Sequence, residues 1–260
     1  MLQPRLIPCL LIHKNGLVKT IKFENPKYVG DPINAVRIFN EKVVDELLVI
    51  DIDATTHGRS PNFKMIANLA RECRMPLTYG GGVTTLEQIQ NLIGLGVEKV
   101  SMSAAAISNP DLIKKATAHV GSQSVVVTID IKKTGFLRRY EIVTHNGTKR
   151  TGIDPIKFAT RVQDLGAGEI VVNSVDMDGT LQGYDVDLIT KFQDQINVPL
   201  TVLGGAGSLD DISELWKTKG LIGAAAGSLF VFKGKYRAVL INYPNLSEKN
   251  DILLSAGWKS

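Results

Sequence analysis

The sequence predicts a (β/α)8 barrel, or TIM barrel, composed of two half-barrels related by an internal repeat. Short, nearly continuous apolar runs alternate with helical patterns eight times, as expected for parallel strands covered on both faces. The length of 260 residues suits one such barrel, so we expect a single domain over 1–260. A doubly wound sheet is the competing fold, but no Gly-x-Gly-x-x-Gly motif follows the first strand.

One arrangement of segments occurs twice along the chain. The corresponding stretches are 50–53 with 175–178, 79–82 with 203–207, and 101–105 with 225–228. The offset is 125 positions from Asp51 to Asp176 and 124 from Gly81 to Gly205. Two halves with the same order of strand, glycine turn and small-residue turn indicate a duplicated fold.

The expected elements follow from apolar runs and from capping residues. Strands are expected at 6–12, 46–52, 76–80, 99–103, 124–130, 169–175, 200–204 and 221–225. Helices are expected at 32–43, 61–73, 85–94, 110–119, 154–165, 186–195, 208–217 and 233–241. Their predicted starts are Asp31-Pro32, Ser60-Pro61, Asn109-Pro110, Asp154-Pro155 and Ser208. We expect a long loop at 13–30 and, around Asn146-Gly147, a hairpin within 131–153.

Composition favours a globular protein that acts in the cytoplasm. The chain is 44% hydrophobic and 22% charged, and no apolar run approaches the ~18 residues of a membrane helix. Residues 1–12 do not resemble a signal peptide. Cys9 and Cys73 lack metal-type spacing, as do the four histidines, so we expect neither a metal nor a cofactor. The basic residues of 132–150 lack interleaved aromatics, which argues against nucleic-acid binding.

Small-residue turns in both halves predict anion binding. The first half offers Gly81, Gly82, Ser103 and Ala104, and the second offers Gly204, Gly205, Gly227 and Ser228. Small residues let backbone N–H groups approach phosphate oxygens. A phosphate-binding turn in each half predicts a small-molecule ligand that carries a phosphate at both ends.

Carboxylates follow several predicted strands, at the barrel end where such enzymes carry out their chemistry. They are Asp51, Asp130, Asp176 and Asp178. Hydrogen bonding to a neighbouring loop is the alternative role for each. Lys19, in the first long loop, is a candidate to reach over the barrel mouth to a phosphate or a sugar hydroxyl.

Residues 5–232 resemble the cyclase subunit of imidazole glycerol phosphate synthase. The matching strings include Cys9-Leu10-Leu11, Val18-Lys19, Gly30-Asp31-Pro32, Gly80-Gly81-Gly82, Asp178-Gly179-Thr180 and Gly204-Gly205-Ala206-Gly207. The resemblance implies a duplicated barrel that takes ammonia from a class I glutaminase at its N-terminal face and acts on a bis-phosphorylated substrate. It also implies that Asp178 and Gly179 contribute to substrate binding, and that Arg5, Glu46, Lys99 and Glu169 form an ammonia gate.

The chain departs from this family at the acid–base pair. The resemblance implies that Asp130 is one catalytic aspartate, but Leu11 stands where the second belongs. Leucine cannot transfer a proton, and such a group contributes about 10²–10⁴-fold in rate. The small-residue turn of the first half differs too, because Ser103-Ala104 stands where the family has Asn-Thr.

The chain is therefore most similar to a cyclase-like subgroup associated with acetamidino modification of surface (lipopolysaccharide) sugars. That resemblance implies ammonia delivery to an ATP-dependent amidotransferase acting on a nucleotide-linked N-acetyl sugar. Two alternatives remain open. One is the cyclase/lyase of histidine biosynthesis, with Asp130 alone or helped by Asp51 or Asp178, and the other is a non-catalytic scaffold that activates a glutaminase.

Overall fold

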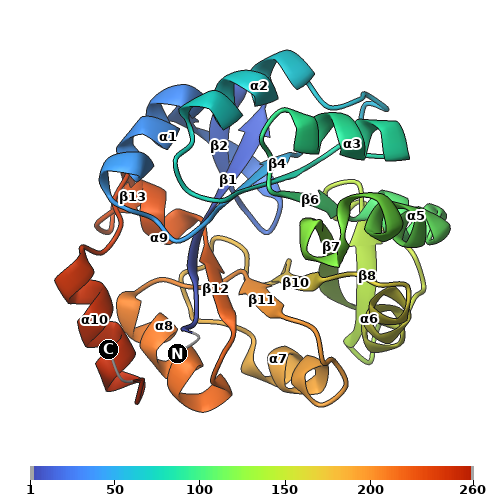
Figure 1. The fold of residues 1–260 in the computed structure, drawn as a ribbon. Helices are drawn as coiled ribbons and strands as arrows, with labels where there is room; N and C mark the ends of the chain where they lie inside the picture. Colours follow the sequence, from blue (N-terminus) through green and yellow to red (C-terminus); the bar gives the residue numbers. More distant parts are fainter. Residues whose placement is uncertain (1–2, 259–260) are drawn as a thin grey trace.

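The computed structural model describes residues 3–258, in which eight parallel strands close into a barrel surrounded by helices (Figure 1). The barrel strands are β1 (Leu6–His13), β4 (Leu47–Asp51), β5 (Leu77–Gly80), β6 (Lys99–Met102), β7 (Val125–Thr134), β10 (Glu169–Ser174), β11 (Leu200–Leu203) and β12 (Gly223–Ala226). Each pairs in parallel with its neighbours, and β12 pairs with β1 to close the ring. The predicted (β/α)8 class is confirmed.

Helices alternate with these strands. They are α1 (Pro32–Glu41), α2 (Phe63–Glu72), α3 (Leu86–Gly94), α4 (Ala104–Ser108), α5 (Asp111–Val120), α6 (Pro155–Asp164), α7 (Val186–Gln193), α8 (Leu209–Lys219), α9 (Ser228–Val231) and α10 (Leu246–Ser255), with a 3-10 turn at Ser122–Ser124. Asp31, Asp154 and Ser208 accept hydrogen bonds from first-turn N–H groups, as predicted. The predicted start of α2 at Ser60-Pro61 is wrong, because Asn62 caps this helix.

Alternation along each strand separates two apolar layers. On β1, Leu6, Leu10 and Ile12 join the large core between barrel and helices, whereas Cys9 and Leu11 join the smaller cluster inside the barrel. A one-residue shift would exchange the two sets, so the inward position of Leu11 is fixed by the register of β1 with β4 and β12.

The two long connections are β-hairpins. The loop expected at 13–30 is instead β2 (Gly16–Ile21) and β3 (Glu24–Gly30), which extend β1 antiparallel. Lys14 and Asn15 have positive φ, which makes the tight turn into Gly16. The hairpin expected near Asn146-Gly147 is confirmed as β8 (Arg139–Thr144) and β9 (Lys149–Arg150), and β7 runs on to pair with β8.

The helix predicted at 233–241 is wrong. Residues 232–239 form a hairpin of β13 (Phe232–Lys233) and β14 (Ala238–Val239), and the helix that follows is α10. Gly234 at φ 70° starts the hairpin turn, whereas Asn245 and Glu248 form a capping box that starts α10. α10 packs against α8, and nearby Tyr243 donates a hydrogen bond to the Leu6 carbonyl at 3.0 Å.

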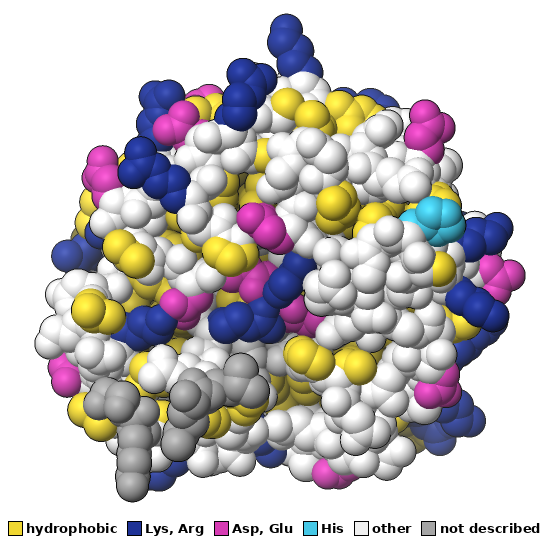
Figure 2. All heavy atoms as spheres, in the orientation of Figure 1, with side chains coloured by type: hydrophobic (Ala, Val, Ile, Leu, Met, Phe, Trp, Pro, Cys, Tyr) yellow, Lys and Arg dark blue, Asp and Glu magenta, His cyan; other side chains and the backbone are white. Residues whose placement is uncertain are grey.

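The barrel end at which the strands begin carries a mixture of charges. Figure 2 shows Lys or Arg and Asp or Glu side chains gathered at the centre of this face, with apolar side chains around them. No helix within residues 3–258 is long and apolar enough to cross a membrane.

Candidate functional site

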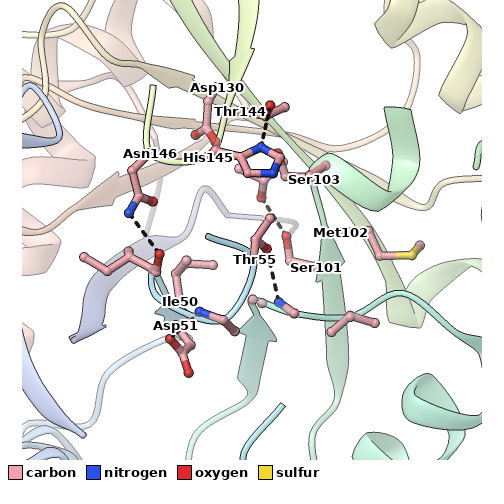
Figure 3. Close-up of a pocket in the computed structure, with 18 of the residues that line it drawn as sticks. Ile50, Asp51, Thr55, Ser101, Met102, Ser103, Asp130, Thr144, His145 and Asn146 are labelled. Atoms are coloured by element: carbon pink, nitrogen blue, oxygen red, sulfur yellow. Dashed lines mark hydrogen bonds between the residues drawn. The ribbon is translucent and has the colours of Figure 1, made fainter. Parts of the chain in front are cut away.

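A cavity of about 260 Å³ opens at the C-terminal ends of the barrel strands. Its lining includes Leu11 from β1, Asp51 from β4, Asp130 from β7 and Asn173 from β10 (Figure 3). Because eight parallel strands end at one rim, side chains that are far apart in sequence meet there. The cavity has the dimensions of a small-molecule site rather than of a macromolecular interface.

Asp130 is a half-buried carboxylate of this cavity. Asn173 lies opposite it in the β7–β10 register, and its Nδ2 donates to Asp130 Oδ1 at 2.8 Å. Burial raises the pKa of Asp130 to about 6, the charge of Asp178 adds to the rise, and hydrogen bonds from Asn173 and Ser103 oppose it. A carboxyl group with this pKa can accept or donate a proton near neutral pH.

Leu11 presents an apolar side chain to the same cavity and is 8% exposed. Asp51 is the other aspartate of the cavity lining, and it accepts from the N–H groups of Asp53 at 2.9 Å and Ala54 at 3.1 Å. These bonds hold the turn that follows β4, although burial raises the pKa of Asp51. Asp51 therefore has a turn-forming role that is independent of any ligand.

The other two aspartates of the predicted set secure loops outside this cavity. Asp178 accepts from Thr20 Oγ1 at 2.7 Å and from the N–H of Phe23 at 3.2 Å, which fastens the β2–β3 hairpin. Asp176 accepts from the N–H of Lys133 at 2.7 Å. Both aspartates are thus engaged in loop-forming hydrogen bonds.

The small-residue turn of the first half lines the cavity. Gly81 has φ 115°, and a Cβ there would lie 2.4 Å from the Asp51 carbonyl oxygen, so only glycine fits. Gly82, Ser103 and Ala104 complete this part of the lining. Ser103 precedes α4, a short helix that the sequence did not predict, and the turn therefore gives backbone N–H groups access to the cavity.

The second turn lies apart from the cavity. Gly204 and Gly205 both have positive φ, and Gly227 and Ser228 lead into α9. Lys19 reaches this turn from β2 and is only 3% exposed, and a Cβ on Gly227 would lie 2.0 Å from its Nζ. The structure therefore places Lys19 beside the second turn. It does not place Lys19 over an open mouth.

Gly179 joins this second group from the loop that follows β10. A Cβ there would lie 2.3 Å from the Thr20 carbonyl oxygen, and φ is 67°. The loop and β2 are thus in direct backbone contact. The residues predicted as substrate-binding therefore form two groups, one at the cavity and one around Lys19.

Four charged residues form a ring at the opposite end of the barrel. Arg5 pairs with Glu46 and, through Nη2, with Glu169 Oε1 at 2.7 Å. Lys99 Nζ lies 2.9 Å from Glu46 Oε2 and 2.8 Å from Glu169 Oε2. Burial opposes the charged form of Glu169, but Arg5 and Lys99 outweigh burial and lower its pKa. All four charges are thus mutually compensated, and the predicted set lies together.

The barrel interior between ring and cavity is mainly apolar. Ile7, Leu48, Val126 and Val171 pack in this layer, and a small cavity of about 10 Å³ lies next to the ring. Cys9 is buried there, and burial raises the pKa of its thiol to about 11, which keeps it neutral. The polar side chains buried along this path are the hydroxyls of Thr78, Ser101, Thr128 and Thr201.

His145 and Asn146 also line the cavity, although neither was predicted as a site residue. They occupy the hairpin turn between β8 and β9, and Figure 3 shows His145 near Asp130 and Ser103. Asn146 Nδ2 donates to the Ile52 carbonyl at 2.9 Å, which fixes the turn across the barrel mouth. The Asn-Gly pair predicted the turn. Its contact with Ile52, directly after β4, could not be predicted because the two segments are far apart in the sequence.

Metal-type clusters are absent from the described residues, since no group of three or more His, Cys, Asp and Glu side chains is arranged to hold an ion. His13 Nδ1 lies 2.7 Å from Asp53 Oδ1, an arrangement that holds β1 to the loop after β4. The basic residues of 132–150 include Lys133, which pairs with Asp185, and Arg150, which pairs with Glu141.

Comparison with known proteins gives consistent matches over nearly the whole chain. Residues 5–237 match the family described as histidine biosynthesis protein. A Leptospira interrogans protein named "Putative imidazole glycerol phosphate synthase subunit HisF" is 55% identical over 249 residues, which cover 96% of this chain and 98% of the relative. The corresponding hisF3 protein of Vibrio vulnificus is 54% identical, with 97% of each chain covered. The hisF2 protein of Pseudomonas aeruginosa is 48% identical, with 95% of this chain and 98% of the relative covered.

Proposed function

The chain belongs to the histidine biosynthesis protein family, as a HisF-like cyclase-type subunit, and we propose that it delivers ammonia rather than closing an imidazole ring. In this proposal a class I glutaminase supplies ammonia, and a separate ATP-dependent amidotransferase uses it to form an acetamidino group on a nucleotide-linked surface sugar. The observation that carries the proposal is Leu11, which faces the cavity at the position of a proton-transfer group in the cyclases it resembles.

Containment explains why ammonia would travel through a barrel. Free ammonia is mostly protonated in neutral water and then has no lone pair for attack. The interior between the charged ring and the cavity is mainly apolar, and its buried polar side chains are the uncharged hydroxyls of Thr78, Ser101, Thr128 and Thr201, so it would favour the uncharged form of ammonia. The ring itself is compact, and a path past it requires a side chain to move. Lys99 is suited to this because its ammonium is a point charge on a flexible stem, whereas Arg5 is a planar guanidinium.

The glutaminase would dock on the barrel face at which the strands begin. Charged side chains of both signs gather at the centre of this face, with apolar side chains around them (Figure 2), and the ring lies at the same end of the barrel. Such a mixture of apolar and charged groups suits a protein interface. Docking there would bring the glutaminase active site to the entrance of the barrel interior, as the family resemblance implies.

An isotope experiment tests delivery. The barrel, its glutaminase, the amidotransferase, ATP and the nucleotide-linked N-acetyl sugar are mixed with [amide-¹⁵N]glutamine in excess unlabelled ammonium chloride. We expect the amidino product to carry far more ¹⁵N than the bath does, as measured by mass spectrometry. A product with the isotope ratio of the bath would contradict delivery and leave the chain as an activator of the glutaminase.

Asp130 favours a second candidate, which is the cyclase/lyase of histidine biosynthesis. Its raised pKa and its place in the cavity are those of an acid–base group, and the named relatives are HisF proteins. In that case Asp130 would work alone, or with Asp51. A cyclase assay with ammonium salt separates this candidate from the first.

A further inference from the structure

The β13–β14 hairpin brings a guanidinium group to the second small-residue turn. Arg237 Nη1 donates to the Gly179 carbonyl at 3.2 Å, and Nη2 donates to Ser228 Oγ at 3.1 Å. Figure 1 shows β13 beside α9, the helix that begins at Ser228. The two acceptors come from separate segments that both belong to the predicted substrate-binding set, so Arg237 bridges two sides of one turn.

The Arg237 side chain is held in place before any ligand binds. Its guanidinium carbon lies 4.7 Å from the centroid of the Phe232 ring, and Lys27 Nζ lies 5.0 Å from the same centroid. Lys27 Nζ also donates to the Arg237 carbonyl at 2.8 Å, which ties the hairpin to β3. The guanidinium is therefore largely ordered before a ligand binds, which lowers the entropic cost of ligand binding.

A second cation reaches the same turn from β2. Lys19 is 3% exposed, and its Nζ lies where a Cβ of Gly227 would be, at 2.0 Å. Within residues 3–258, neither Lys19 nor Arg237 forms a salt bridge with a carboxylate. The protein thus supplies no anionic partner to either cation, and an anion between them would supply one.

We propose that Arg237 is an anion-binding residue that closes the second turn over a phosphate monoester, opposite Lys19. The guanidinium has N–H donors beyond the two that contact Gly179 and Ser228, and its planar donor geometry matches phosphate oxygens. Two cations at one turn favour a doubly charged phosphate over a singly charged anion. The proposal does not rest on ammonia delivery, and it takes from the sequence only the expectation that both small-residue turns bind phosphate.

The first turn lacks this arrangement and serves as an internal reference. Arg59 is the cation of the cavity lining, and its Nη2 already lies 3.6 Å from Asp53 Oδ2. Its charge is therefore partly compensated by the protein itself. The two turns therefore bind phosphate unequally. The second turn, with Lys19 and Arg237, binds it more tightly.

Titration with inorganic phosphate, followed by ¹H–¹⁵N NMR of the full chain, tests this assignment at each turn separately. The amide signals of Gly227 and Ser228 report on the second turn, and that of Gly82 reports on the first. We expect Arg237→Gln to weaken phosphate binding at the second turn by about tenfold or more, with the first turn unchanged. Arg237→Lys should recover part of the loss.

Lys235→Gln is the matched control. Lys235 lies on the same hairpin over the Tyr236 ring, at 4.9 Å from its centroid, and removing its charge changes the net charge equally. It should leave phosphate affinity at both turns unchanged. Equal affinity of wild type and Arg237→Gln at the second turn would overturn the role of Arg237 alone. Absence of a wild-type response at both turns would overturn the phosphorylated ligand as well, whereas the isotope experiment on ammonia is unaffected by either result.

Discussion

Leu11 and Asp130 line one cavity from different strands of the barrel, and the aspartate has an apolar neighbour there instead of a second carboxylate from β1. Asp130 keeps its hydrogen bond from Asn173 and a pKa near 6. The cavity thus retains Asp130 as a proton-transfer group with a useful pKa. With Leu11 in place of a second carboxylate, we expect the cavity to hold a ligand but not to close a ring on it.

Asp130→Asn should stabilise the protein at neutral pH. Burial raises the pKa of Asp130 from 3.8 to about 6, so within this window the folded chain binds a proton that the unfolded chain releases. Stability therefore falls as pH rises from about 4 to 6, and asparagine removes a cost of about 3 kcal/mol. Urea unfolding at about pH 7.5 measures the gain, which should vanish near pH 4.

Asp154→Asn is the control for that substitution. Asp154 is the N-cap of α6, accepting from the N–H groups of Ile156 and Lys157, and asparagine caps a helix about as well. Its effect should stay within about 0.5 kcal/mol at both pH values. If Asp130→Asn is no more stable than wild type at pH 7.5, the raised pKa of Asp130 is wrong.

Glu169→Gln should destabilise the barrel strongly. Glu169 compensates Arg5 and Lys99 and accepts from Thr201 Oγ1 at 2.6 Å, so its removal leaves cations short of a partner. We expect a loss of about 3 kcal/mol, at the low end for broken buried pairs because Arg5 is partly exposed. Thermal unfolding measures the loss.

Glu72→Gln provides the matched comparison on the surface. Glu72 pairs with Arg37 at 3.0 Å, and both side chains are substantially exposed. Its loss should cost less than about 1 kcal/mol. Similar losses for the two variants would show that the ring at the base of the barrel is no more than a set of surface ion pairs.

Gly227→Ala should weaken phosphate binding without unfolding the chain. A methyl group at this position would lie 2.0 Å from Lys19 Nζ and 2.3 Å from its Cε, so the lysine must leave the turn. Because a flexible side-chain end can move, stability should change little, whereas phosphate affinity at the second turn should fall about tenfold. The NMR titration at Ser228 measures this change.

Gly94→Ala is the control for that glycine. Gly94 ends α3, and a Cβ there would meet nothing within 4 Å. Alanine should stabilise the helix by about 0.5–1 kcal/mol and leave phosphate binding unchanged. An unchanged phosphate affinity in Gly227→Ala would exclude Lys19 as the cation of the second turn.

The barrel itself could be predicted because its signals are local. Each buried parallel strand is a short apolar run, and Asp31, Asp154 and Ser208 mark helix starts within three residues of the groups that they cap. The error at 233–241 has a local cause as well, since Gly234 and the capping box at Asn245 signal a turn and a later helix.

The site could be predicted only in part, because its other determinants are long-range. The glycine turns are visible in sequence, but Lys19 is separated by more than 200 positions from Gly227, beside which it lies. Arg237 and His145 were missed for the same reason, since each sits on a hairpin turn with no motif of its own. Only the closure of the barrel brings these turns to one end.

Cyclase activity tests the central claim most directly. The purified chain is assayed with ammonium salt and the bis-phosphorylated ribulosyl substrate of the cyclase family, together with Leu11→Asp and, as an isosteric control, Leu11→Asn. We predict no measurable turnover for wild type and Leu11→Asn, and a gain for Leu11→Asp, because of these three side chains only aspartate restores a carboxyl group at the β1 side of the cavity. Wild-type turnover at ordinary enzyme rates, about 1–10³ per second, would contradict the account and make the chain a working cyclase.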